Sequence, residues 1–84
     1  MKFRYANDNT ALHYAALIAG EPHAVRILLK YGAFVNIINN EMKSPLFNAV
    51  ISNNPLAAAS LIQYNADFKI RNSEGNTAFD LIKG

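Results

Sequence analysis

Residues 10–16 read Thr-Ala-Leu-His-Tyr-Ala-Ala, and a similar stretch returns twice along the chain. Residues 44–50 read Ser-Pro-Leu-Phe-Asn-Ala-Val, and residues 77–82 read Thr-Ala-Phe-Asp-Leu-Ile. The first return comes after 34 residues and the second after 33. Self-similarity at such a period is the sequence signature of a repeat architecture.

A second block repeats with the same period. Residues 27–36 read Ile-Leu-Leu-Lys-Tyr-Gly-Ala-Phe-Val-Asn, and residues 60–69 read Ser-Leu-Ile-Gln-Tyr-Asn-Ala-Asp-Phe-Lys. Two matched blocks at one spacing are far harder to obtain by chance than one short motif. We place the extra residue of the first copy in the stretch 19–22.

Each repeat opens with residues that favour a short helix. Thr10 and Ser44 suit the N-cap position, because their hydroxyls can accept an N–H of the first turn. Pro45 then falls at the first helical position, where its missing N–H costs nothing. Small and apolar residues recur at three- and four-residue spacing, at Leu12, Ala15, Ala16 and Ala19. The alanines predict that neighbouring helices approach closely.

A second helix is predicted to begin near Pro22 in the first copy and near Pro55 in the second. Gly32 and Asn65 follow these helices, and both residue types tolerate the left-handed conformation that ends many helices. The intervening stretches are rich in Asn, Ser and Gly, which favour turns. We therefore expect the order hairpin, helix, turn, helix, repeated.

These motifs resemble the ankyrin repeat family, whose repeats open with Thr-Pro-Leu-His-x-Ala-Ala and close with Leu-Leu-x-x-Gly-Ala-x-x-Asn. The resemblance covers nearly the whole chain. It implies an all-α solenoid, an ankyrin-repeat stack of helix-turn-helix units joined by β-hairpin-like loops. It divides the single domain 1–84 into a repeat at about 5–38, a second at about 39–71 and part of a third at about 72–84.

Three residues depart from the family pattern. Phe47 stands where histidine is usual, Asn65 where glycine is usual, and Met42 where the hairpin glycine is usual. The resemblance implies a positive φ at the hairpin position, which a side chain with a Cβ adopts at a cost of about 1–2 kcal/mol. Met42 is therefore predicted to hold a strained backbone.

Composition narrows the class of protein. The 84 residues include no cysteine, which excludes disulfides and a cysteine-based zinc site. With 51% hydrophobic and 17% charged residues the chain is too apolar to be a disordered tail. No apolar run approaches the roughly 18 residues of a membrane-spanning helix. Since secretory and glycosylation signals are also missing, we expect an intracellular protein, cytoplasmic or nuclear, or one in the host cell cytoplasm if it is viral or an effector.

The sequence carries no catalytic signature. It contains no phosphate-binding loop, no nucleophile elbow and no pair of carboxylates placed for acid–base chemistry within one predicted element. His13 and His23 are the two histidines, and they lack the third ligand and the spacing of a metal site. We therefore expect no catalytic, cofactor-binding or metal-binding residues, and no enzyme. The resemblance implies that His13 hydrogen-bonds adjacent loops together, and Asp80 stands at the equivalent position.

The resemblance further implies that a protein partner binds along the hairpin tips and the exposed side of the first helices. The tip residues are Asn7, Asn9, Asn40, Glu41, Lys43, Ser73, Glu74 and Asn76. The first-helix residues are Tyr14, Leu17, Ile18, Asn48, Ile51 and Ser52. Tip amides and hydroxyls can donate and accept hydrogen bonds, and the aliphatic residues would form an apolar strip. Alternatively, Leu17 and Ile51 only pack beneath the neighbouring hairpin.

Two kinds of function fit these expectations. The first is a non-catalytic protein–protein interaction module. The alternative is a substrate-targeting arm of a larger enzyme or of a host-directed effector. The partner is expected to be another protein and neither nucleic acid nor membrane, because the eight basic residues are scattered rather than clustered in a stripe.

The ends of the chain carry an expectation of their own. Each repeat buries its hydrophobic face only against its neighbours, and terminal repeats normally carry polar caps, which this sequence lacks. We expect the chain to be an excerpt of a longer array. Alternatively, a partner or a second copy of the chain completes it, and the uncapped ends then lead to self-association.

Overall fold

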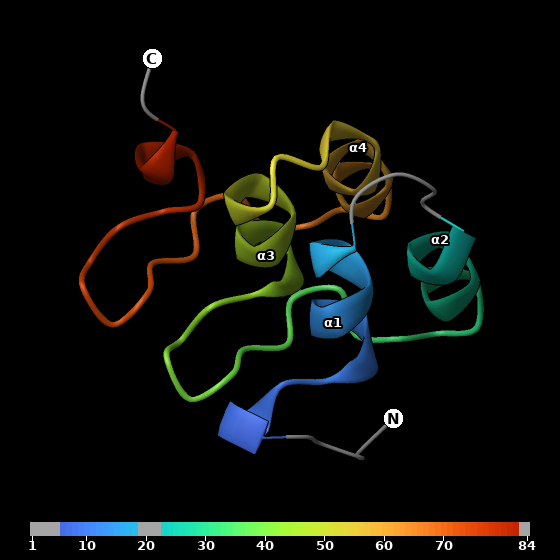
Figure 1. Ribbon diagram of the computed structural model, residues 1–84, viewed down its shortest axis with the longest axis horizontal. Helices are drawn as coiled ribbons and strands as arrows, with labels where there is room; N and C mark the ends of the chain where they lie inside the picture. The colour runs from blue at the N-terminus through green and yellow to red at the C-terminus, as the bar shows by residue number, and fades with distance from the viewer. Residues whose placement is uncertain (1–5, 19–22, 83–84) are drawn as a thin grey trace.

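The computed structural model describes residues 6–18 and 23–82, which fold into four α-helices and two short 3₁₀-helices without any strand. The elements are η1 (Ala6–Asp8), α1 (Ala11–Leu17), α2 (His23–Lys30), α3 (Pro45–Ile51), α4 (Pro55–Gln63) and η2 (Phe79–Leu81). Helices α1 and α3 lie side by side, α2 and α4 form a second pair, and two long loops project away from the helices (Figure 1). This is the all-α repeat fold that the sequence predicted. The predicted helical positions Ala19 and Pro22 lie outside the described residues.

The helices begin where the capping residues predict. The Thr10 hydroxyl accepts the backbone N–H of His13, and the His13 ring accepts the backbone N–H of Thr10, which makes a reciprocal capping box at α1. Ser44 precedes α3 and Pro45 opens it as predicted, but the predicted hydroxyl cap is wrong. The N–H of Phe47 donates to the backbone oxygen of Ser44 at 3.0 Å instead of to its hydroxyl.

The second helices end in left-handed residues. Gly32 has a φ of 92° after α2, and Asn65 has a φ of 68° after α4. In each case the backbone N–H of the next residue donates to a carbonyl oxygen in the last turns of the helix. Ala33 donates to the Leu28 oxygen at 2.9 Å, and Ala66 donates to the Leu61 oxygen at 3.0 Å. The two repeats therefore close with the same hydrogen bond, and asparagine substitutes for glycine as predicted.

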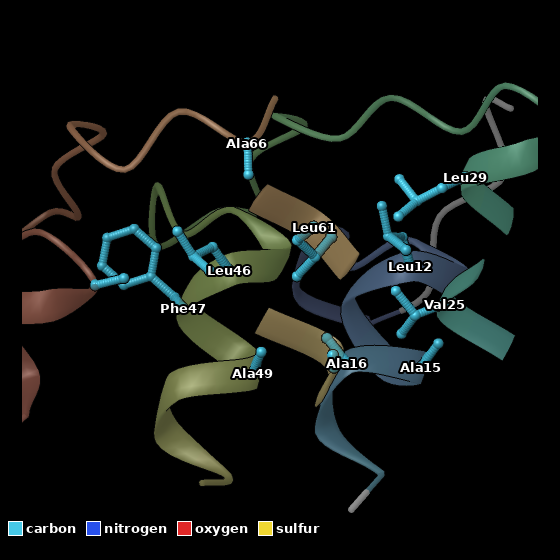
Figure 2. Close-up of a cluster of buried hydrophobic side chains, with 12 residues drawn as sticks. Leu12, Ala15, Ala16, Val25, Leu29, Leu46, Phe47, Ala49, Leu61 and Ala66 are labelled. Atoms are coloured by element: carbon cyan, nitrogen blue, oxygen red, sulfur yellow. The ribbon is translucent and has the colours of Figure 1, made fainter. Parts of the chain in front are cut away.

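One apolar core runs through both repeats. Leu12, Val25, Leu29 and Leu61 converge between α1, α2 and α4, while Ala15, Ala16 and Ala49 occupy the crowded helix contacts (Figure 2). These alanines are buried and leave room for α1 and α3 to approach closely. Truncating one of the buried leucines to alanine would cost about 2–5 kcal/mol of stability.

Equivalent positions of the two repeats differ in burial, and the difference identifies the end faces of the stack. Leu29 on α2 is 5% exposed, because α2 packs against both α1 and α4. The equivalent Ile62 on α4 is 43% exposed, because no further helix covers α4 within the described residues. Beside Ile62 an apolar groove of about 540 Å³ runs along α3, α4 and η2. We call this surface the C-terminal end face; its lining includes Val50, Ala58, Ile62, Phe79, Leu81 and Ile82.

Candidate partner-binding surface

Each of the two long hairpins is organised by one buried asparagine. The Oδ1 atom of Asn39 accepts the backbone N–H groups of Glu41 and Lys43 at 2.9 and 3.0 Å. Asn72 repeats this with Glu74 and Asn76, both at 3.0 Å. The role of these asparagines was not predicted, although they stand 33 residues apart and a glutamate follows each of them after one residue, at Glu41 and Glu74, which was a usable signal for their position.

Backbone hydrogen bonds join neighbouring hairpins into one row. The N–H of Asn40 donates to the oxygen of Asn7, and one repeat later the N–H of Ser73 donates to the oxygen of Glu41, both at 3.0 Å. The Asn39 amide also donates to Oδ1 of Asn9 at 2.9 Å. The three tips therefore sit in a fixed register rather than as independent loops.

His13 ties the row of tips to the core. Its ring is fully buried, and Nδ1 accepts the Thr10 N–H at 3.0 Å, so the ring proton is on Nε2. Nε2 donates to the backbone oxygen of Lys43 at 2.8 Å, which confirms the predicted bond between adjacent loops.

Asp80, at the position equivalent to His13, repeats the hydrogen bond with the residue three positions before it. Its Oδ2 atom accepts the Thr77 N–H at 2.9 Å, as the His13 ring accepts that of Thr10. This bond, followed by the Thr77 side chain and by the positive charge of Arg71, lowers the pKa of Asp80 from its ordinary value.

The tip side chains present polar groups to solvent. Exposed members are Asn7, Asn40, Glu41, Ser73 and Glu74, and half-buried members are Asn9, Lys43 and Asn76. The Lys43 ammonium lies 3.5 Å from a Glu41 carboxylate oxygen. The row of tips therefore presents positive and negative charges, amide groups and a hydroxyl along one edge of the molecule.

Leu17 and Ile51 occupy equivalent positions at the ends of α1 and α3. They are 41% and 53% exposed, although α1 and α3 pack against each other. Both side chains keep apolar area open to solvent, and the alternative that they pack beneath the neighbouring hairpin stays a prediction. Tyr14 on α1 and Ile18, which directly follows α1, are also exposed. Together with the tips, these residues make up what we call the tip-and-helix surface.

Two of the predicted first-helix residues connect repeats instead of facing outward. Asn48 was expected on the exposed side, but it is 8% exposed and its amide donates to the His13 oxygen at 3.1 Å. The equivalent Tyr14 is exposed because no repeat precedes it in the described residues. Ser52 is half-buried, and its hydroxyl donates to the oxygen of Ala16 at 3.2 Å.

A third residue that connects the two repeats, Asn54, was not predicted from the sequence. Its Nδ2 donates to the Ile18 oxygen at 2.7 Å, while its Oδ1 accepts the first-turn N–H of Ala57 and so caps α4. A capping asparagine before Pro55 was readable from the sequence, but the bond back to the first repeat was not.

The described residues hold no group of three or more His, Cys, Asp or Glu side chains that could ligate a metal ion. In the same part of the chain no helix is both long and apolar enough to cross a membrane.

A stack of helix pairs with a row of hydrogen-bonded hairpins is the architecture of a repeat protein that works through its surface. The chain belongs to the ankyrin repeat family: residues 1–78 match the family model described as ankyrin repeats in three copies. Ankyrin repeats are non-catalytic modules that generally mediate protein–protein interaction.

Several curated proteins contain a similar segment. The chain is 36% identical over 78 residues to the probable palmitoyltransferase AKR2 of Saccharomyces uvarum, covering 93% of this chain and 10% of that protein. It is 45% identical over 71 residues to the putative ankyrin repeat protein FPV031 of Fowlpox virus, covering 82% of the chain and 20% of the relative. It is 41% identical over 56 residues to protein fem-1 homolog C of Xenopus laevis, covering 67% of the chain and 9% of that protein. The chain thus spans a fifth or less of each of these relatives.

Proposed function

We propose that this chain is a non-catalytic interaction module whose tip-and-helix surface binds a protein partner. The polar tips supply hydrogen bonds and charges, and the aliphatic residues at the ends of α1 and α3 supply apolar contact. The repeats that carry this surface are those expected at about 5–38, 39–71 and 72–84.

The exposure of both Leu17 and Ile51 is the observation that carries the proposal. Stacking of the repeats buries Leu12 of α1 and Leu46 of α3, whereas Leu17 and Ile51 stay exposed, so the core of the fold does not account for aliphatic side chains at this position. Fully burying such a side chain contributes about 1.5–3 kcal/mol, and the exposed 41% and 53% of Leu17 and Ile51 leave the corresponding part of that gain to a partner. Adjacent repeats present the same position, so one partner segment can contact both.

Site-specific photo-cross-linking tests the proposal. A photoreactive residue is introduced at Glu41 or Glu74, both exposed tip positions, and at Leu56, an exposed position on α4. We expect both tip positions to cross-link the same protein from a cell extract, and Leu56 to leave that protein unlabelled. Labelling of one protein from Leu56 alone would refute the surface assignment.

A second candidate places the same surface within a larger protein, as a substrate-targeting arm of an enzyme or of a host-directed effector. The likeness to a segment of a probable palmitoyltransferase and to a viral ankyrin protein favours this candidate. In that case the surface selects the substrate and the chemistry lies in other residues. Ile51→Asp in the larger protein would then reduce modification of one substrate and leave activity on a short generic substrate unchanged.

We further propose an intracellular protein partner and no nucleic acid or membrane ligand for this surface. The cysteine-free composition and the mixed charge of the tips support this choice. The end faces suggest self-association as a second mode of contact. Ile62 and the groove beside it offer apolar area that a second copy can cover.

A further inference from the structure

A second groove lies on the side of the molecule away from the hairpin tips. It runs between α2 and α4, the pair at the upper right of Figure 1, and has a volume of about 410 Å³. Its lining consists of Arg26, Ile27, Lys30, Gln63 and Tyr64. We call it the outer groove.

The charge of the outer groove is positive, and no described residue compensates it with an ion pair. Arg26 and Lys30 stand one helical turn apart on α2, both exposed, and neither forms an ion pair with the residues that the structure describes. Helix α4 carries no charged side chain. The carboxylates of the described residues lie in the hairpins and 3₁₀-helices, at Asp8, Glu41, Asp67, Glu74 and Asp80.

Comparison of the two repeats shows that the fold does not require the positive charges of Arg26 and Lys30. The positions on α4 that correspond to Arg26 and Lys30 are Ala59 and Gln63. A neutral residue therefore satisfies the helix at both places, and the two positive charges are a feature of the first repeat alone.

We propose that the outer groove binds an acidic peptide segment of a protein partner, independently of the tip-and-helix surface. Side chains at i and i+4 of a helix lie about 6 Å apart, and alternate residues of an extended peptide are separated by about 6.6 Å. Two carboxylates in the pattern acidic-x-acidic therefore match Arg26 and Lys30. Ile27 and Tyr64 supply apolar contact, and the Gln63 amide can donate to or accept from the peptide backbone.

The test uses the full chain and a synthetic peptide that repeats Glu-Leu-Glu-Ser, with the matching Gln-Leu-Gln-Ser peptide as control. We expect the glutamate peptide alone to bind, with backbone NMR shifts concentrated at the groove residues and an affinity that falls as salt is added. Lys30→Glu should weaken binding about tenfold, since it replaces an attraction by a repulsion.

Lys69→Glu is the matched control, because it makes the same charge reversal at an exposed lysine outside the outer groove. It should change the affinity by less than about twofold. Arg26→Gln provides a milder second variant, and circular dichroism checks that each variant is folded.

Three results would overturn the proposal. One is equal binding of the two peptides, and another is an equal loss in Lys30→Glu and Lys69→Glu, which would reflect net charge alone. The third is Lys30-dependent binding to phosphatidylserine vesicles or to a single-stranded oligonucleotide without binding of the peptide. Each of these leaves the tip-and-helix surface untested, so the two proposals fail separately.

Discussion

The Nε2 atom of His13 lies 2.8 Å from the backbone oxygen of Lys43, and this hydrogen bond fastens α1 of one repeat to the hairpin of the next. Because His13 is fully buried, the hairpin that carries Glu41 and Lys43 is held against the core rather than by surface contacts alone. The tips can therefore meet a partner in a preset arrangement, which lowers the ordering cost of binding.

His13→Phe should lower the free energy of unfolding by about 1–3 kcal/mol. Phenylalanine occurs naturally at the equivalent position, Phe47, but at position 13 it would leave the Lys43 oxygen and the Thr10 N–H without their present partner. Urea denaturation of the two proteins measures the difference.

The same change at the exposed His23 is the control for that experiment, and it should shift stability by no more than about 0.5 kcal/mol. Equal stability of His13→Phe and the parent would contradict the role given to the bond between His13 and Lys43.

Much of the fold could be predicted from the sequence, because most of the signals for helix starts and helix ends agreed with the repeat. The helix starts at Thr10 and Pro45 and the left-handed residues Gly32 and Asn65 follow from residue type alone. The positive φ predicted at Met42 is also confirmed, at 62°.

The burial of individual polar residues could not be predicted in the same way. Asn48 and Tyr14 share one repeat position, yet among the residues that the structure describes only Asn48 has a preceding repeat to cover it and accept its hydrogen bond. Periodicity along the chain does not distinguish these two environments. The roles of Asn39 and Asn72 were hidden because asparagine in a loop indicates a turn without indicating which N–H groups it holds.

Met42→Gly should raise the free energy of unfolding by about 0.5–1 kcal/mol. Relief of the positive φ stabilises the folded chain, and the more flexible unfolded chain offsets part of that gain. The equivalent Gly75 already adopts a φ of 84°. Chemical denaturation measures the change, with Asn65→Gly as the comparison, for which we expect a smaller effect because asparagine tolerates this conformation.

A loss of stability in Met42→Gly would mean that packing of the Met42 side chain outweighs the strain of its backbone. Unchanged stability together with weaker partner binding would instead assign Met42 to the interface.

The lowered pKa of Asp80 predicts that the hydrogen bonds at the start of η2 depend on pH. Its pKa is lowered chiefly by the hydrogen bond from the Thr77 backbone and then by the Thr77 side chain, from a starting value of 3.8. The stabilisation is therefore present above that starting value and is lost as the pH falls through the lowered pKa. Thr77→Val should move the pKa of Asp80 upward in an NMR titration, whereas Thr77→Ser should leave it nearly unchanged. An identical pKa in all three proteins would show that the Thr77 hydroxyl has no influence.

The C-terminal end face predicts concentration-dependent behaviour. We expect the isolated chain to be marginally stable or to self-associate, and Ile62→Glu to weaken the association, because it places a charge in the apolar groove. Sedimentation over a concentration series measures this, with Leu56→Glu as the control at an exposed residue outside that groove. A monomer that melts sharply above about 65 °C at every concentration would contradict the expectation.

The central claim, that the tip-and-helix surface binds a protein partner, is tested most directly by comparing Ile51→Asp with Leu56→Asp against the partner identified by cross-linking. The two side chains are exposed to nearly the same extent, 53% and 56%, but only Ile51 belongs to the proposed surface. Isothermal titration calorimetry should show that Ile51→Asp weakens binding by at least about tenfold, or 1.4 kcal/mol. Leu56→Asp should bind like the parent, and both variants should keep the parent's circular dichroism. Normal binding by a folded Ile51→Asp, or an equal loss in both variants, would contradict the assignment of this surface.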